Sequence, residues 1–160
     1  TSRRQRQMCI RDRDVLEGEN VREDAQKIVI FFTDGEPNHY SGFDSTVAND
    51  TITTAKALKE KNTKIYSVGM FDDADPSNED TDQGNRFNAY MHGVSSNYPA
   101  ATAWNDLGER AKDSEGNSTA YYKAAGNADD LSKIFEEIFT EINTIDPTSP
   151  VVEGLSLIHI

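Results

Sequence analysis

The residues best placed to do chemistry directly follow the most apolar stretch of the chain. Ile28 to Phe32 are five consecutive apolar residues, and Thr33, Asp34 and Gly35 come next. An apolar run without alternation is typical of a strand covered on both faces, as at the centre of a parallel sheet. Ligands bind at the carboxyl ends of such strands, where Gly35 permits an abrupt turn. The hydroxyl and the carboxylate therefore mark a candidate ligand site, although Asp34 could equally serve as a turn cap.

The loop after this turn supplies the expected rim of the site. It is rich in turn-forming residues and follows the same strand, so its side chains are expected at the same edge of the sheet. His39 could bind a metal or act in catalysis, but a lone histidine in a polar loop is more often solvated. The side chains that we expect to border a ligand are those of Glu36, Asn38, His39 and Tyr40.

A second candidate site lies in residues 72–85, which hold six acidic residues and no basic one. Carboxylates at alternate positions can share a calcium ion. The spacing departs from the helix-loop-helix calcium pattern, because the glycine and the late glutamate of that pattern are missing from their places. A solvated acidic loop is therefore the favoured interpretation, and a weak calcium loop is the alternative. Its ligands would be Asp73, Asp75, Asp80 and Asp82.

The sequence carries no motif that predicts an enzyme. It lacks a Gly-x-Ser-x-Gly elbow, a phosphate-binding loop and a His-Glu-x-x-His zinc motif, and no histidine is paired with a nucleophile. Haloacid-dehalogenase-like phosphatases also place Asp-Gly after an apolar strand, but they need a nucleophilic aspartate two residues earlier. Phe32 occupies that position and cannot attack phosphorus. We therefore expect a protein that is not an enzyme, with a phosphatase as an unfavoured alternative.

Alternating strands and helices must position the candidate site. Apolar residues at helical spacing follow Asp44-Ser45-Thr46, which can cap a helix, and a second apolar strand follows that helix. A strand, a helix and a strand in this order predict a right-handed βαβ unit with parallel strands. Residues 95–118 have no clear period and are expected to form an insertion or a rim on the ligand side. The predicted elements are strand 28–32, helix 47–62, strand 64–71, helix 85–94, strand 120–124 and a helix capped by Asn127 that reaches Ile142.

The composition narrows the class of partner. The chain of 160 residues is long enough for one domain with a substantial core. Its formal net charge of -12 opposes binding to nucleic acids and to anionic membrane surfaces. Cys9 is the single cysteine, so neither an intrachain disulfide nor a cysteine metal cluster can form. No run approaches the roughly 18 apolar residues of a membrane helix, so we expect no membrane insertion in this segment.

Both ends of the chain differ in character from the middle. Residues 1–14 are rich in arginine in an otherwise acidic chain, and both this segment and Leu155 to Ile160 resemble translated sequencing adapters. We therefore predict an artefactual or disordered arm over residues 1–14 and a partial domain over residues 15–145. Residues 146–160 are predicted to be a linker or the start of another domain, with an artefactual tail. The alternative is a native basic arm and a short terminal strand.

Four segments in a fixed order carry a resemblance to a known family. They are Ile28 to Pro37 (IVIFFTDGEP), Lys64 to Phe71 (KIYSVGMF), Phe87 to Pro99 (FNAYMHGVSSNYP) and Tyr121 to Ile142 (YYKAAGNADDLSKIFEEIFTEI). Together they resemble the carboxyl-terminal half of a von Willebrand factor type A domain, and within that family the cell-surface and pilus-tip adhesins of Gram-positive bacteria. The resemblance implies a Rossmann-like, doubly wound, mostly parallel α/β sheet with helices on both faces, truncated at its amino end.

The same resemblance implies a metal-ion-dependent adhesion site at the carboxyl edge of the sheet. In the family, three loops build this site: an Asp-x-Ser-x-Ser loop, a loop that supplies a threonine, and the aspartate of Thr-Asp-Gly. Only the last matches here, at Asp34, with Thr33 and Gly35 beside it. Hard oxygen ligands of this kind suit Mg²⁺ or Ca²⁺, but one carboxylate cannot hold the ion alone. We therefore expect Asp34 to contribute to the site in the full-length domain, and this fragment to bind metal weakly or not at all.

By resemblance, the expected function is a metal-ion-dependent adhesion or ligand-binding module of a bacterial surface or pilus protein. Its expected location is extracellular, in the cell wall or the pilus. The expected partners are a protein or glycan ligand on the host or matrix, and other pilus or cell-wall subunits. An intracellular scaffold domain of the same family is the alternative. We further expect residues 72–85 and 95–118 to shape ligand choice before stability.

Overall fold

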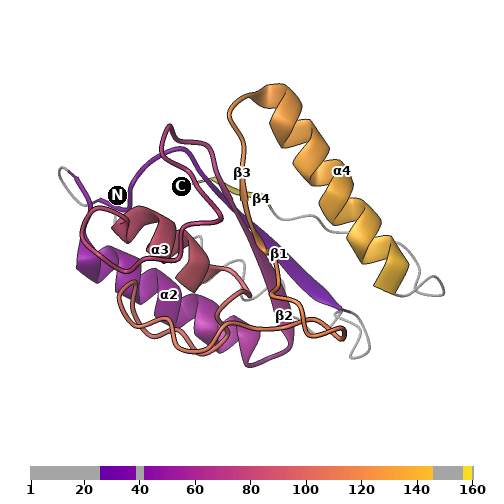
Figure 1. Ribbon diagram of the computed structural model, residues 1–160, viewed down its shortest axis with the longest axis horizontal. Helices are drawn as coiled ribbons and strands as arrows, with labels where there is room; N and C mark the ends of the chain where they lie inside the picture. Colours follow the sequence, from indigo (N-terminus) through magenta and orange to yellow (C-terminus); the bar gives the residue numbers. More distant parts are fainter. Residues whose placement is uncertain (1–25, 39–41, 146–156, 160) are drawn as a thin grey trace.

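Helices and strands alternate along the chain in the computed structural model, which describes residues 26–38, 42–145 and 157–159. Helices α2 and α3 cover one face of a four-stranded sheet, and α4 covers the other (Figure 1). Within these residues, no helix is long and apolar enough to cross a membrane. The elements are β1 (Lys27–Thr33), α2 (Ser45–Lys59), β2 (Thr63–Gly69), α3 (Arg86–Val94), β3 (Tyr122–Ala124), α4 (Ala128–Ile145) and β4 (Leu157–His159).

The sheet has the strand order β3-β2-β1-β4, and all of its neighbouring strands are parallel. β1 and β2 pair along their whole length, from Lys27 opposite Thr63 to Thr33 opposite Gly69. Their carboxyl ends therefore lie at the same edge of the sheet. A parallel sheet with helices on both faces confirms the predicted Rossmann-like α/β class.

The apolar run of β1 contributes to two hydrophobic cores, one on each face of the sheet. Val29 and Phe31 pack with residues of α2 and α3, whereas Ile30 and Phe32 pack with residues of α4. All four side chains are buried. Each such burial stabilises the fold by about 1.5–3 kcal/mol relative to leaving the side chain exposed.

The first turn of α2 is set by Asp44, so the helix begins slightly earlier than predicted. The Asp44 carboxylate accepts hydrogen bonds from the backbone N–H groups of Thr46 and Val47, at 2.8 and 3.2 Å. These two donors have no partner within the helix, and an aspartate in this position commonly stabilises a helix by about 1 kcal/mol. The residues that α2 buries are Ala48, Ile52 and Ala55.

Residues 108–118 are mostly exposed, as an insertion or a rim would be, but the part of segment 95–118 up to Leu107 belongs to the hydrophobic core, which was not predicted from the sequence. This part follows α2 from end to end. Near the carboxyl end of the helix, the Lys59 ammonium donates to the backbone carbonyl of Tyr98 at 2.9 Å; at the amino end, the Trp104 indole donates to the Ser45 hydroxyl at 3.2 Å. Replacing this segment should therefore reduce stability before it changes ligand choice. Its buried apolar side chains are Tyr98, Ala101, Trp104 and Leu107.

The predicted segments at the two ends fall mostly outside the described residues. The artefactual or disordered arm over residues 1–14 and the linker that starts at residue 146 therefore remain predictions. Near the carboxyl terminus, the backbone of β4 pairs in parallel with Ile30 to Phe32 of β1.

Candidate functional site

The turn after β1 presents Asp34 to solvent. Thr33 is buried, and its hydroxyl both donates to the carbonyl of Gly35 at 2.7 Å and accepts from the backbone N–H of Gly35 at 3.2 Å. This local pairing turns the chain away from the sheet within two residues. Asp34 and Gly35 are exposed as a result. The Thr33 hydroxyl is thus engaged in shaping the turn, while the Asp34 carboxylate faces outward.

A small hollow lies beside this turn and opens at the carboxyl edge of the sheet. Its volume is about 200 Å³. Sites for drug-sized molecules usually occupy about 300–1,000 Å³, so this hollow is better matched to a single side chain or a hydrated ion. It combines aromatic walls with a polar rim from the turn after β1. The lining residues are Phe31, Thr33, Asp34, Gly35, Glu36, Pro37, Asn38 and Tyr90.

Two neighbouring elements hold the rim in place. The backbone N–H of Met70, directly after β2, donates to the carbonyl of Thr33 at 2.9 Å. The backbone N–H of Asp44, just before α2, donates to the carbonyl of Pro37 at 2.7 Å. The loop after β1 is therefore pinned at both of its ends by backbone hydrogen bonds, which limits movement of the side chains that it carries.

The predicted metal ligand and the predicted rim residues that are described line this hollow, whereas the four predicted calcium ligands of loop 72–85 do not. Asp34, Glu36 and Asn38 all line it, and the Asn38 amide donates to the Glu36 carbonyl at 3.3 Å. His39 and Tyr40, the other predicted rim residues, lie outside the described part of the chain. Tyr90 was not predicted to line the site. Its helical spacing predicts a core residue, and Tyr90 is indeed buried in the core. One sequence signal pointed to its additional place beside the hollow, namely that α3 follows the loop after β2.

The acidic loop over residues 72–85 uses some of its carboxylates internally. The Asp75 carboxylate accepts hydrogen bonds from the hydroxyl and the backbone N–H of Ser77, and these bonds hold its pKa below the ordinary value. The Asp82 carboxylate accepts from the backbone and the side chain of Asn85. One member of each predicted calcium pair therefore closes a local turn. All four candidate ligands, Asp73, Asp75, Asp80 and Asp82, are exposed.

Metal binding by the described residues alone would be incomplete. In this part of the chain, no group of three or more histidine, cysteine, aspartate or glutamate residues is placed to hold an ion. Asp34 offers one hard oxygen donor group at the hollow, with Glu36 two residues away. Mg²⁺ and Ca²⁺ take six or more oxygen ligands, of which only some can be water in a tight site. Asp34 therefore fits as one ligand, and the remaining protein ligands are not supplied by these residues.

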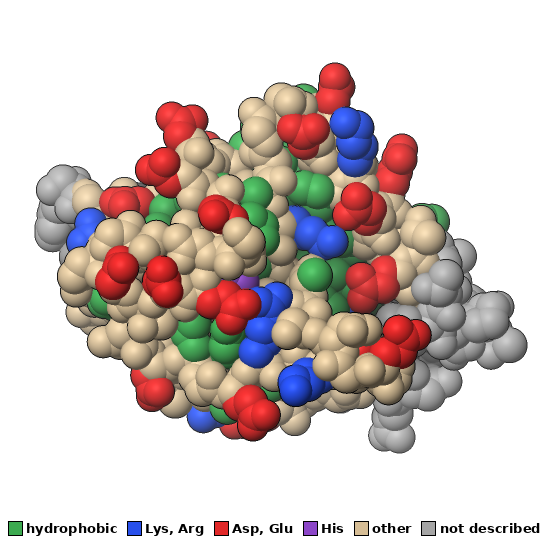
Figure 2. Space-filling view, viewed as in Figure 1, with side chains coloured by type: hydrophobic (Ala, Val, Ile, Leu, Met, Phe, Trp, Pro, Cys, Tyr) green, Lys and Arg blue, Asp and Glu red, His purple; other side chains and the backbone are tan. Residues whose placement is uncertain are grey.

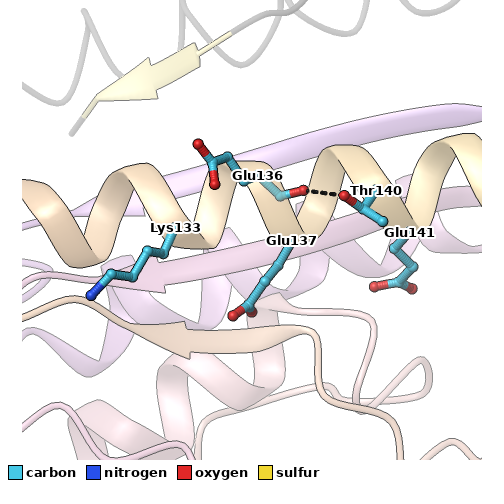
Figure 3. Close-up of a pocket in the computed structure, with 5 residues that line it drawn as sticks. All are labelled: Lys133, Glu136, Glu137, Thr140 and Glu141. Carbon is cyan, nitrogen blue, oxygen red and sulfur yellow. Dashed lines mark hydrogen bonds between the residues drawn. The ribbon is translucent and has the colours of Figure 1, made fainter.

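A second, wider hollow lies on the polar side of α4 (Figure 3). Its volume is about 590 Å³, but it is open to solvent and is formed by one helix face. Two of its glutamates lie near lysines of the sheet: Glu137 is 3.3 Å from Lys123, and Glu141 is 3.8 Å from Lys64. Exposed pairs of this kind stabilise by about 0–1 kcal/mol and are typical of a solvated surface. The hollow at the end of β1, where several loops meet, remains the better candidate.

The surface charge argues against binding to polyanions, and the burial of Phe32 argues against a phosphatase. Carboxylates are spread across the face of the molecule seen in Figure 2, in keeping with the net charge of -12 and against binding to polyanions. Phe32, the position at which a phosphatase of the predicted alternative would carry its nucleophile, is buried in the core beneath α4. A substrate at the carboxyl edge would not reach that side chain.

Comparison with known proteins gives a family. The family model for the von Willebrand factor type A domain matches residues 13–110, which include β1, α2, β2 and α3 together with the turn that carries Asp34. No curated protein and no solved structure gives a significant match. The match therefore supports the family and leaves the subgroup of adhesins as a prediction.

Proposed function

Since the chain belongs to the von Willebrand factor type A family, whose domains generally serve as binding or scaffold modules, we propose that it is the ligand-binding part of a metal-ion-dependent adhesion module. The proposed host is a bacterial surface or pilus protein. The proposed ligand is a protein or glycan of the host or matrix, bound at the carboxyl edge of the sheet. Other pilus or cell-wall subunits are further proposed partners.

The observation that carries this proposal is the exposed Asp34 carboxylate beside the hollow of about 200 Å³. A hollow of that size accepts one side chain or one sugar substituent, and its polar rim lies next to aromatic walls. The loop that carries Asp34 is pinned by backbone hydrogen bonds at both ends. A pre-organised rim loses little conformational entropy on binding, which favours a recognition role.

Within the proposed site, Asp34 is the residue of this chain that would hold Mg²⁺ or Ca²⁺, directly or through water. When bound, such an ion would attract an acidic group of the partner. Thr33 keeps the turn closed, so that the carboxylate points away from the sheet. Glu36 and Asn38 border the same hollow and would contact the ligand.

An extracellular location is proposed from the family resemblance together with the chemistry of the domain. The acidic surface suits a soluble adhesin, and a chain whose single cysteine is Cys9 needs no disulfide to fold. The second candidate is an intracellular scaffold domain of the same family, which would not bind matrix proteins or glycans.

The test is a binding assay with the longest protein that the source reading frame encodes. Binding to immobilised matrix proteins and glycans would be measured in magnesium and in a chelator, for the native sequence, Asp34→Asn and the control Asp82→Asn. The proposal predicts that the chelator and Asp34→Asn each weaken binding by at least tenfold, while Asp82→Asn leaves it unchanged. Equal binding by all three proteins in both buffers would contradict it.

A further inference from the structure

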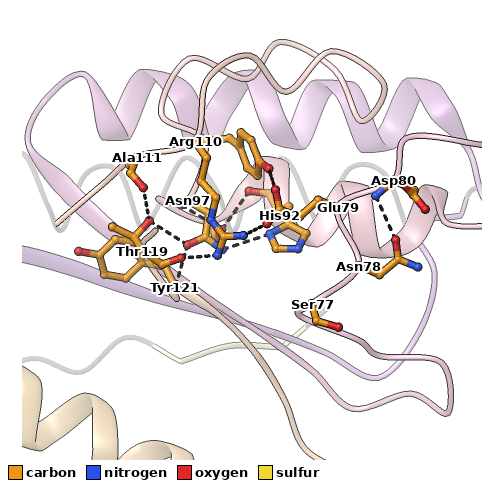
Figure 4. A network of polar contacts seen from close by, with 12 residues as sticks. Ser77, Asn78, Glu79, Asp80, His92, Asn97, Arg110, Ala111, Thr119 and Tyr121 are labelled. Carbon is orange, nitrogen blue, oxygen red and sulfur yellow. Dashed lines mark hydrogen bonds and ion pairs between the residues drawn. The ribbon is translucent and has the colours of Figure 1, made fainter. Parts of the chain in front are cut away.

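A network of polar side chains, none of which lines the hollow beside Asp34, lies between α3, the acidic loop and the start of β3 (Figure 4). We call it the polar network. Its hydrogen bonds join the loop after β2 to segment 95–118, two parts of the chain that the sequence gives no reason to connect. The members are Glu79, His92, Asn97, Tyr98 and Arg110.

His92, on α3, is the buried centre of this network. Its exposed fraction is 0 %, and the rings of Tyr98 and Tyr122 meet it edge to face at 5.7 and 5.0 Å between centroids. The Nε2 atom is buried and makes no hydrogen bond of good geometry among the described residues, but the backbones of Pro76 and Asn78 interact with the ring. Because the ring is fully buried, a change in its protonation would have structural consequences.

Asn97 determines which nitrogen of His92 carries the proton. The side-chain oxygen of Asn97 accepts a hydrogen bond from the backbone N–H of Tyr121 at 2.8 Å. Its amide nitrogen must then face the other way, where it lies 3.1 Å from Nδ1 of His92. Because that nitrogen is a donor, Nδ1 must be the acceptor and the neutral ring must carry its hydrogen on Nε2.

A second proton on His92 cannot be accommodated in this arrangement. The new N–H on Nδ1 would point at the N–H groups of the Asn97 amide. If the amide turned over, its N–H groups would instead meet the backbone N–H of Tyr121, which can only donate, and the hydroxyl of Thr119, which could turn to accept. Both arrangements leave a donor without an acceptor, so protonation favours exposure of the ring to water.

The acidic loop is the side from which water can most easily reach His92. The backbones of Pro76 and Asn78 lie against the ring. Residues Ser77 and Glu79 of the same loop are exposed, whereas Tyr122 on the other side of the ring is 1 % exposed. Moving the loop would break few apolar contacts, and moving Tyr122 would open the core.

Two sets of contacts hold the loop closed over His92. The Glu79 carboxylate accepts hydrogen bonds from the Tyr98 hydroxyl and from the Arg110 guanidinium. Nearer the start of the loop, the Asn88 side chain on α3 donates to the carbonyl of Asp73 at 3.0 Å and accepts from the backbone N–H of Asp75 at 2.9 Å. Because Glu79 and Arg110 are both partly exposed, their contact can be lost without unfolding the sheet.

We propose that His92 and Asn97 form an acid-operated latch on loop 72–85: the loop is closed while His92 is neutral and opens when the ring takes up a proton. This inference does not depend on the proposed adhesive function. The loop leaves the same sheet edge as Asp34, because β1 and β2 are parallel and end side by side. Its opening would therefore also change the surroundings of the candidate site.

The charged groups that face His92 are Arg110, Glu79 and Asp75. The pKa of His92 is lowered from 6.5 to about 4, mainly by burial and also by the Arg110 charge, while the Glu79 charge and the backbones of Asn78 and Pro76 oppose the shift. In the open loop the ring is solvated and returns to its ordinary pKa. As the pH falls below 6.5, the ring therefore takes up a proton in the open form but not in the closed form. The fraction of molecules with an open loop increases as a result, until the closed form is protonated as well at a pH of about 4.

Hydrogen exchange of the whole chain tests the latch. The exchange of amides in residues 73–80, corrected for the intrinsic effect of pH, would be followed from pH 7.5 to pH 5 for the native sequence and for His92→Gln. The latch predicts that opening of the native loop increases about tenfold for each pH unit below 6.5, and that His92→Gln shows no such increase. A native loop whose opening does not change over this range would overturn the proposal, as would an unchanged slope in His92→Gln.

A pair of matched substitutions tests the role of Asn97. In Asn97→Asp, one oxygen can still accept from Tyr121 while the other accepts a proton-bearing Nδ1, so His92 should become charged without opening the loop. Loop opening should then no longer increase as the pH falls, so that the pH slope seen in the native chain disappears. Asn105→Asp adds the same charge at an exposed position of the same segment and should keep the native slope. If Asn97→Asp kept the native slope, Asn97 would not be part of the latch.

Nuclear magnetic resonance of the His92 ring in the native chain supplies a measurement that needs no variant to fold. The latch predicts the Nε2–H tautomer and no protonation of the ring in the closed loop above pH 5. Titration of His92 near pH 6.5 with the loop amides still protected would overturn the proposal.

Discussion

Two loops leave the same edge of the sheet, one after β1 and the other after β2, and they treat their carboxylates differently. The loop after β1 leaves Asp34 exposed beside a hollow and relies on backbone hydrogen bonds and on Thr33 for its shape. The loop after β2 uses Asp75, Glu79 and Asp82 in hydrogen bonds to its own neighbours. The comparison teaches that the number of acidic residues is a poor guide to a binding site. The carboxylates of Asp73 and Asp80 in the acidic loop are also exposed and accept none of the described hydrogen bonds, so what distinguishes Asp34 is the hollow that it lines.

The largest expected effect tests whether the segment beside the second loop is structural. Trp104→Ala would remove a side chain that is 5 % exposed and whose indole N–H reaches Ser45. We expect the free energy of unfolding to fall by about 3 kcal/mol, as for other buried tryptophans. Urea denaturation measures this change. A loss below about 0.5 kcal/mol would mean that segment 95–118 is a surface insertion after all.

The second largest effect is expected at Glu79, which attaches the acidic loop to segment 95–118. Burial of the Glu79 carboxyl favours a higher pKa, but the hydrogen bond from Tyr98 and the charge of Arg110 outweigh it and hold the pKa below the ordinary value. Its contribution to stability is therefore present at neutral pH and is lost as the pH falls through that lowered pKa. For Glu79→Gln we expect a loss of about 1 kcal/mol at pH 7 in urea denaturation. The loss should shrink in acid; a loss that is equal at pH 7 and pH 3 would contradict the assignment.

The smallest effect is expected at the candidate site. The Asp34 side chain is exposed and makes no structural hydrogen bond among those described, so Asp34→Asn should change the free energy of unfolding by no more than about 0.5 kcal/mol. Thermal denaturation of the variant beside the native chain measures this. If Asp34→Asn destabilised the protein as much as Glu79→Gln, Asp34 would be a turn cap and the contrast between the two loops would fail.

The sequence was a good guide wherever a local pattern decides the structure. The run from Ile28 to Phe32 predicted a strand buried on both faces, and Asp44 and Asn127 were expected as helix caps, which the hydrogen bonds to their side chains confirm. These features depend on residues within a few positions of one another. The strand–helix–strand order then settled the parallel pairing of β1 and β2.

Features that depend on distant contacts were missed. Tyr98 and Trp104 are buried without any periodic spacing, because an irregular segment packs against α2 through isolated side chains. Asn97 satisfies a backbone donor at Tyr121, and nothing in the sequence between them indicates it. At the candidate site, Asp34 could be found from the end of its strand. Tyr90 could not, because its spacing on α3 indicates only that it faces the core.

The central proposal is that a divalent ion, if held by this chain at all, is held weakly at the Asp34 carboxylate and not in the more acidic loop after β2. Titration of the isotope-labelled chain with Mn²⁺, which broadens amide signals close to it, tests this directly and detects weak binding. The account predicts that the signals of Asp34 and Gly35 broaden first and recover in Asp34→Asn, while Asp82→Asn has no effect on them. Broadening that begins in residues 72–85 and is unaffected by Asp34→Asn would contradict it.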